Sequence, residues 1–335
     1  MRARWLSGVA ALVGTAVLAG AATGDTSSQP LRIGLVVQNT DLTDAYQRGV
    51  LIGAERAVRE LGVTVRTITH PPNRSSVAAF RYLAHHGYDL ILTYGFDETA
   101  DLDTAARQFP NQKFAIVDGS IQDLTHHPRN VQGGTFRTEQ PAYLAGYLAA
   151  LLERRRPGKD VMGSVGGYKI PTVDAYIAGF QAGARKADPG IRLLNGYSND
   201  FSVQSKCRSV ALAQIAGGAG AILQVADFCG LGALAAAKEK GVWGIGVDAD
   251  QSYLGPFVLT SVVKRLDVAV FDTIKAFTEG KLRPGTDATF DLASGGVALG
   301  KVSPRVPRSL VAKLDPIRTQ ILSGAIHVPS TLRTP

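Results

Sequence analysis

Acidic, amide and aromatic side chains follow the apolar segments of this chain at the points where those segments end. Asp118 follows "KFAIV", Asp248 and Asp250 follow "VWGIGV", and Asp227 with Phe228 follows "AGAILQVA". Similar positions after other apolar segments hold Gln38, Asn39, Asp41, Tyr94, Phe96, Tyr197, Asn199, Asp200 and Phe201. Carboxylates accept hydrogen bonds from hydroxyls, and aromatic rings stack on flat groups. The set predicts a polar, flat ligand, such as a sugar joined to a heterocyclic base.

Taken singly, these residues have ordinary explanations. An aspartate after a strand is usually a turn residue or a helix cap, and a lone aromatic residue there usually packs in the core. In open parallel sheets, however, ligands bind outside the carboxyl ends of the strands, where all the strand ends of one sheet meet. The number of such ends favours a shared binding site over separate turns.

The elements that must position these residues form a repeated unit. A short β-branched apolar run is followed by a turn and then by a helical stretch, first over 31–119 and again over 160–250. Near-continuous apolar strands that alternate with helices are typical of parallel sheets covered on both faces. The sequence therefore predicts an α/β fold with two doubly wound parallel-sheet lobes.

The expected division follows from where the series restarts. We expect a signal peptide and short linker at 1–30, a first lobe of 31–155 plus about 256–282, and a second lobe of 156–255 plus about 283–330. The segments after 255 are too few for a third lobe. They are expected to cross between the two lobes and to leave a hinge of several strands.

The N-terminus is typical of an exported protein. Arg2 and Arg4 precede an apolar run, and Ala19 to Ala21 has the small-residue pattern of a cleavage site. An uncleaved anchor helix is the alternative, because the run is nearly long enough to span a bilayer. In either case we expect the protein to lie outside the cytoplasm, free or at the outer face of the membrane. The segment holds no cysteine, so we expect no lipobox cysteine.

The net charge does not indicate a nucleic-acid partner. The formal charge of +8 becomes +7 when Arg2, Arg4 and Asp25 leave with the leader, and the remaining basic residues are scattered. Their densest cluster, at 153–159, closes an expected helix, where it suits the negative end of the helix dipole. A nucleic-acid groove would need several such clusters interleaved with aromatic residues.

The sequence gives little support to catalysis, and we expect neither a metal nor a cofactor. None of the six histidines follows a strand as a catalytic base or metal ligand would, and the chain lacks a P-loop, a nucleophile elbow and a glycine-rich dinucleotide fingerprint. A nucleoside hydrolase remains the enzymatic alternative. The two cysteines, Cys207 and Cys229, are expected to form a disulfide, because pairs in exported proteins usually do.

Several stretches together resemble the basic membrane protein family, the substrate-binding proteins of ABC transporters. They are "FAIVDG", "RTEQPAYLAGYLAA", "GYKIPTVDAYIAGFQAGARKADPGI", "CGLGALAAAKEKGVWGIGVDADQ" and "VLTSVVKRLDVAV", within about 31–330. The resemblance implies a type I periplasmic-binding-protein fold whose lobes close on a nucleoside-like ligand. It also implies delivery to an ABC permease by a chain that acts as a monomer. The same resemblance fits an extracellular sensor or a binder of another sugar-like solute.

The resemblance also implies roles for particular residues. Asp118 and Asp248 match the family's acceptors for ribose hydroxyls, and Lys264 matches a lysine of the ligand cleft. The expected ligand-binding set is Asn39, Tyr46, Phe96, Asp118, Phe201, Asp227, Phe228, Asp248 and Lys264. The sequence departs from the family at two positions. The first is the run "NTDLTDAYQRG", which lacks the Phe-Asn pair of the family. Asp227 and Phe228 replace a pair of glycines, which is expected to narrow the site.

Overall fold

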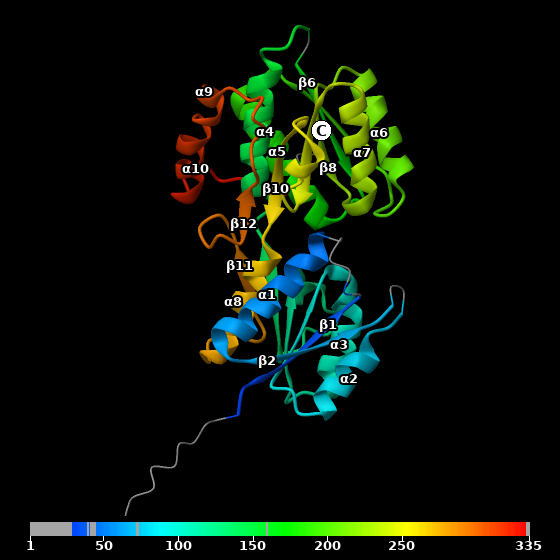
Figure 1. The fold of residues 1–335 in the computed structure, drawn as a ribbon, viewed down its shortest axis with the longest axis vertical. Helices are drawn as coiled ribbons and strands as arrows, with labels where there is room; N and C mark the ends of the chain where they lie inside the picture. Colours follow the sequence, from blue (N-terminus) through cyan, green and yellow to red (C-terminus); the bar gives the residue numbers. More distant parts are fainter. Residues whose placement is uncertain (1–28, 39, 41–44, 72–73, 159, 333–335) are drawn as a thin grey trace, which may run out of the picture. The chain divides into compact units, whose positions relative to one another are not determined.

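The computed structural model describes residues 29–38, 40, 45–71, 74–158 and 160–332 (Figure 1). Two six-stranded sheets organise residues 31–332. The strands are β1 (Arg32–Val37), β2 (Thr64–Thr69), β3 (Leu90–Tyr94), β4 (Lys113–Val117), β5 (Val131–Phe136), β6 (Val161–Gly166), β7 (Arg192–Tyr197), β8 (Ala221–Val225), β9 (Trp243–Asp248), β10 (Val258–Lys264), β11 (Asp287–Phe290) and β12 (Val297–Leu299). The helices are α1 (Ala45–Leu61), α2 (Val77–His85), α3 (Thr99–Gln108), α4 (Glu139–Glu153), α5 (Pro171–Ala187), α6 (Gln204–Ala216), α7 (Asp227–Glu239), α8 (Leu266–Thr278), α9 (Arg308–Val311) and α10 (Leu314–Leu322), with short turns of 3-10 helix at Phe96–Glu98, Ile121–Asp123 and Ser252–Leu254.

The first sheet is entirely parallel, in the order β11-β5-β4-β3-β1-β2. Its central strands are apolar along their whole length because both faces are covered. In β1, Ile33 and Leu35 pack into the cluster that includes α1 and α8, whereas Val36 packs on the opposite face with α2 and α3. This alternation follows from the two-residue period of a strand. The parallel, doubly covered sheet expected from the sequence is therefore present.

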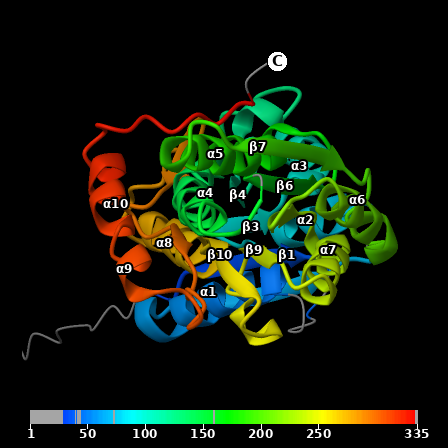
Figure 2. The ribbon, with the colours of Figure 1, turned by 90° about the horizontal axis from the view of Figure 1, so that it is seen from above.

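The second sheet has the order β12-β10-β9-β8-β6-β7, with β12 antiparallel to β10 and the other pairs parallel. One face packs against α4, α5, α9 and α10, and the other against α6 and α7. Figure 2 shows α4 beside α5 and α6 beside α7. The chain thus has two α/β lobes of the doubly wound type.

Helices α4 and α5 lie unusually close because glycines form their contact. A Cβ atom added to Gly183 would lie 2.0 Å from the Tyr143 carbonyl oxygen, and one on Gly146 would lie 2.0 Å from that of Phe180. Only glycine lets the backbones approach this far. The contact holds α5 against α4, and the first turns of α5 form one wall of the site described below.

Three elements lie in the other lobe from the one expected. Strand β10 pairs with β9 in the second sheet, β11 pairs with β5 in the first, and α4 packs into the core of the second lobe. The expectation placed 256–282 and α4 in the first lobe and 283–330 in the second. An apolar strand pairs as readily with either of two similar sheets, so its local pattern does not specify the partner.

The chain crosses between the sheets three times, from β5 to α4, from β10 to α8 and from β11 to β12. Strand β5, with the sequence "VQGGTF", lacks a strand-like apolar pattern and is absent from the sequence-based expectation. Its Gly133 is required by packing, because a Cβ there would lie 1.9 Å from an Asp287 carboxylate oxygen. In the described part of the chain, no helix is long and apolar enough to cross a membrane; the expected leader lies outside that part.

Candidate ligand-binding site

A buried ammonium group lies between two carboxylates where the lobes meet. Lys264 Nζ is 2.8 Å from Asp118 Oδ2 and 3.9 Å from Asp248 Oδ1, and the lysine side chain is only 7% exposed. Asp118 follows β4 of the first sheet, whereas Asp248 and Lys264 end β9 and β10 of the second. Paired parallel strands bring Asp248 and Lys264 together, and the ion pair with Asp118 links the two lobes.

The lysine stays charged in this position. Burial alone lowers the pKa of Lys264, but the charges of Asp118 and Asp248 and the hydrogen bond to Asp118 outweigh it, so the pKa is raised. Its ammonium also lies 5.6–5.7 Å from the ring centroids of Tyr46, Phe136 and Tyr176, within the range of cation–π attraction. Lys264 is therefore a fixed positive charge between two carboxylates and three aromatic rings.

Two tyrosine hydroxyls orient the carboxylates. Tyr46 donates a hydrogen bond of 2.6 Å to Asp118 Oδ2, and Tyr176 donates one of 2.8 Å to Asp248 Oδ1. Burial, together with the nearby carboxylates, raises the pKa of both tyrosines well above the usual value. Both hydroxyls therefore remain protonated donors, and their hydrogen bonds fix the orientation of the two carboxylates.

The backbone at the strand ends is unusual. Asp118, Asp227, Asp248 and Asn199 have positive φ angles of 61°, 47°, 63° and 53°, each just after or at the end of a strand. Aspartate and asparagine are the side-chain-bearing residues that adopt this left-handed region most readily. Strained conformations of this kind concentrate at binding sites, where they direct a side chain that a regular strand would turn elsewhere.

Two cavities meet at the ion cluster. The first, here called the aromatic chamber, has a volume of about 420 Å³ and is lined by residues of both lobes that include Tyr46, Tyr94, Phe96, Phe201, Asp227 and Asp248. The second, here called the polar chamber after the carboxylates of Asp123 and Asp174 that line it, has a volume of about 780 Å³, and apolar atoms make up most of its lining surface. Asp118, Tyr176 and Lys264 line both chambers. Volumes of this size are typical of small-molecule sites.

Aromatic rings from different lobes approach each other in the aromatic chamber. The ring centroids of Phe96 and Phe201 are 6.2 Å apart with planes inclined by 52°, and Tyr168 lies 5.2 Å from Phe201. Phe96 is 47% exposed although it is a large apolar residue. Exposed rings beside buried carboxylates suit a ligand with one flat, apolar face and one hydroxyl-bearing end.

Most of the sequence-predicted residues come together here. Tyr46, Phe96, Asp118, Phe201, Asp227, Asp248 and Lys264 all line the aromatic chamber, and Asn39 lies outside the described residues. Phe228 is 57% exposed and lines neither chamber, so only Asp227 of the pair lies at the site. Helix α7 begins at Asp227, and successive helical residues project about 100° apart, which separates the two side chains.

Some site residues were not predicted. Tyr176 lies within α5, where its spacing is that of an ordinary buried helix residue, and Phe136 ends the unexpected strand β5. Asp97, which follows Phe96, accepts a hydrogen bond from Gln38 at the rim of the aromatic chamber.

Asp250, which also follows β9, holds its loop in place. It accepts hydrogen bonds from the backbone nitrogens of residues 252 and 301.

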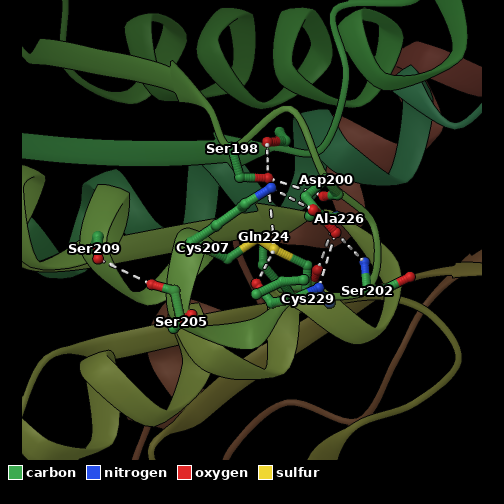
Figure 3. The surroundings of a disulfide bond; sticks show 12 residues. Ser198, Asp200, Ser202, Ser205, Cys207, Ser209, Gln224, Ala226 and Cys229 are labelled. Atoms are coloured by element: carbon green, nitrogen blue, oxygen red, sulfur yellow. Dashed lines mark hydrogen bonds and ion pairs between the residues drawn. A yellow bond between two sulfur atoms is a disulfide. The ribbon is translucent and has the colours of Figure 1, made fainter.

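The expected disulfide is present. Cys207 of α6 and Cys229 of α7 are bonded, and both are fully buried (Figure 3). The backbone nitrogen of Cys229 donates a 2.8 Å hydrogen bond to the carbonyl of Phe201, and Asp227 lies two residues before it. The disulfide therefore joins the starts of two helices directly behind one wall of the aromatic chamber. Among the described residues, no group of three His, Cys, Asp or Glu side chains could hold a metal ion.

This geometry agrees with comparisons to known proteins. Residues 33–331 match the family described as "Bmp: ABC transporter substrate-binding protein PnrA-like". The chain belongs to this family. PnrA-like proteins are extracytoplasmic substrate-binding components of transporters and not enzymes, which agrees with the sequence-based expectation.

Individual relatives cover most of this PnrA-like protein. The ABC transporter nucleoside-binding protein BmpA of Lactococcus lactis is 32% identical over 263 residues, which cover 73% of this chain and 72% of the relative. Basic membrane protein A of Borreliella burgdorferi is 30% identical over 315 residues, covering 92% and 90%.

The fold is also found among solved structures. A solute-binding protein of an ABC transporter system from Aeropyrum pernix has a TM-score of 0.74 at 22% identity, over 90% of this chain and 94% of that one. At this identity the likeness concerns the fold alone. It confirms the type I periplasmic-binding-protein architecture of two parallel-sheet lobes.

Proposed function

We propose that this substrate-binding protein captures a nucleoside between its two lobes and delivers it to an ABC permease. The observation that carries the proposal is the cluster of Asp118, Lys264 and Asp248, built from both lobes beside the rings of Phe96 and Phe201. The nucleoside-binding function in the name of the Lactococcus lactis relative supports the same ligand class.

Each half of a nucleoside has a matching surface. Hydroxyls of the sugar donate to Asp118 and Asp248, whose orientation is set by the hydroxyls of Tyr46 and Tyr176. The Lys264 ammonium, whose pKa is raised by the two carboxylates, donates to a sugar oxygen. The base stacks against the aromatic rings in the same chamber. Charge-assisted hydrogen bonds in a partly buried site give the sugar its orientation.

The charge of the aromatic chamber selects against phosphate. Among the residues that the structure describes, four carboxylates line it, those of Asp97, Asp118, Asp227 and Asp248, and one ammonium, that of Lys264. The chamber is therefore acidic in a chain whose formal charge is +8. A phosphorylated nucleoside would bring two further negative charges toward these carboxylates. The ligand is accordingly a free nucleoside rather than a nucleotide.

Binding is coupled to lobe closure. A sugar that touches Asp118 on the first lobe and Asp248 on the second contacts both lobes only when they are close, so the ligand stabilises the closed form. The three chain crossings act as the hinge, and the side chain of Lys264 lies directly at one of them.

We further propose that residues 1–30 are a leader removed on export and that the mature protein acts as a monomer. The basic start, the apolar run and the small residues at 19–21 support this. N-terminal sequencing of the exported protein and its elution volume in size-exclusion chromatography test these two points.

Calorimetric titration of the mature chain with adenosine, inosine, free adenine and D-ribose tests the proposed ligand. We expect the nucleosides to bind and Asp248→Ala to weaken them by roughly 10- to 100-fold, because a charge-assisted hydrogen bond is lost. Asp315→Ala, at an exposed position of α10, is the matched control and leaves affinity unchanged. Absence of heat with every nucleoside, or full affinity in Asp248→Ala, would refute the assignment.

A further inference from the structure

The polar chamber is larger than the chamber that the proposed function uses. It adjoins the aromatic chamber at Asp118, Tyr176 and Lys264, which are the groups assigned to the sugar. Its volume of about 780 Å³ compares with about 420 Å³ for the aromatic chamber, which is itself of ordinary size for a small ligand. A sugar held at the shared boundary therefore has a second cavity directly beside it.

The polar chamber has a wall that belongs to neither sheet. The first lobe contributes Ser120 and Asp123, which follow β4, and the second lobe contributes the first turns of α5. The third wall is the C-terminal tail, with Ser330 and Thr331. The tail runs from α10 past α5 (Figure 2). It is held in place because Val328 is 6% exposed and belongs to the core of the second lobe. The chamber is thus a constructed cavity with three walls, and not simply the gap between two lobes.

The groups that line the chamber define what it can accept. Beyond the shared ion cluster, its charged side chains are Asp123 and Asp174 against Lys169, so it carries one net negative charge. Asp174 accepts a hydrogen bond from the hydroxyl of Tyr197. Burial and this carboxylate raise the pKa of Tyr197 to about 12, so the hydroxyl stays protonated. The carboxylates suit an amino or hydroxyl group and disfavour phosphate. Phe136, Ile170 and Leu332 also line the chamber and suit an apolar portion of the same substituent.

We propose that the natural ligand is a nucleoside whose sugar carries a further substituent, in which an amino or hydroxyl group is joined to an apolar portion, and that this substituent occupies the polar chamber. The proposal rests on the function proposed above and narrows its ligand class. An amino group would pair with Asp123 or Asp174, and hydroxyls would be shared with Ser120 and the tail.

Matched pairs of nucleosides test this inference by calorimetric titration of the mature chain. Adenosine is compared with its 5′-amino-5′-deoxy derivative and with adenosine monophosphate. Puromycin aminonucleoside is compared with puromycin, which adds an amine-bearing aminoacyl group to the sugar. We expect at least one amine-bearing compound to bind about tenfold or more tightly than its parent, and the monophosphate to bind more weakly than adenosine.

Variants of the polar chamber test whether the higher affinity of an amine-bearing derivative arises in this chamber. Asp123→Asn and Asp174→Asn remove the carboxylates, and Ala175→Leu fills part of the space. Each is expected to reduce the ratio of derivative to parent affinity, by about tenfold for the variant that removes the paired carboxylate. Asp315→Asn makes the same chemical change at an exposed position of α10 and leaves the ratio unchanged.

The outcomes separate the two proposals. If the parent nucleosides bind but every substituent weakens binding, or if the gain survives all three variants, the polar chamber is not a subsite and the inference is overturned. If neither parents nor derivatives bind, the nucleoside function itself fails, and the inference fails with it.

Discussion

Replacing Lys264 by methionine removes the ammonium between Asp118 and Asp248 and keeps most of the volume of the side chain. The two carboxylates then remain side by side, 11% and 23% exposed, without their cation. Because one partner of a buried ion pair is removed, the loss includes the cost of leaving the others poorly solvated. This substitution therefore tests whether the cluster holds the lobes together.

The magnitude follows from the geometry. At an effective dielectric constant of about 20, contacts of 2.8 and 3.9 Å correspond to attractions of about 6 and about 4 kcal/mol. Desolvation of the three charges offsets much of this, and breaking a buried pair usually costs roughly 3–5 kcal/mol. Asp248 can regain water more easily than Asp118, so we expect a loss of about 3 kcal/mol in the free energy of unfolding near neutral pH.

The loss should depend on pH in a defined direction. The pKa of Lys264 is raised in the folded state, so its contribution is fully present below the usual lysine value and disappears only as the pH rises through the raised pKa. The difference between the two proteins should therefore persist up to the usual pKa of lysine and shrink only above it.

Urea unfolding at about pH 7 and about pH 9, followed by circular dichroism, measures this difference. Lys281→Met is the matched control, because Lys281 lies at the same 2.8 Å from Glu279 but is 72% exposed, where an ion pair contributes at most about 1 kcal/mol. A loss below about 1 kcal/mol in Lys264→Met near neutral pH, or a loss that has already disappeared at about pH 9, would refute the reasoning.

Three other predictions can be measured independently. Replacing Cys207 and Cys229 by serine should lower the free energy of unfolding by about 3 kcal/mol, because the bond closes a loop with a sequence separation of 22; an effect equal to that of reduction by dithiothreitol is expected, and no effect would contradict it. Gly183→Ala should destabilise the fold by several kcal/mol, roughly the cost of overpacking or more. The added Cβ would lie 2.0 Å from the carbonyl oxygen of Tyr143. Gly190→Ala, whose added Cβ would have its nearest neighbour at 3.6 Å, is the control and should have little effect on thermal unfolding. Adenosine monophosphate should bind more weakly than adenosine, and the gap should narrow as salt is added; a salt-independent gap would argue against charge repulsion.

Local sequence patterns predicted much of the fold. Near-continuous apolar runs such as that of β1 require cover on both faces, and their alternation with helices leaves few arrangements other than parallel sheets. The ends of those strands predicted Asp118 and Asp248, because the position of a residue relative to a strand end is a local property. The pairing of Cys207 with Cys229 was likewise predicted, from composition and compartment.

The partner of each element was not predicted. Strand β10 was assigned to the first lobe and β11 to the second, and both lie in the opposite sheet. The sequence does not predict strand β5, because its two glycines, which close packing requires, weaken the apolar pattern. Similar strands compete for similar sheet edges, and the choice between them depends on contacts far apart in the sequence.

By itself the sequence determined the fold class, the repeated unit and the polar strand ends, since these depend on period and on neighbouring residues. Only the tertiary structure decided that Lys264 lies between the two aspartates, that Tyr176 reaches them from a helix, and that the C-terminal tail closes a second chamber. The contacts of Lys264 with Asp118 and of Tyr176 with Asp248 join segments more than 70 residues apart in the sequence. Only Asp248 and Lys264 lie on strands that are neighbours in the sequence. Their geometry is set by the packing of whole elements, which no local pattern contains.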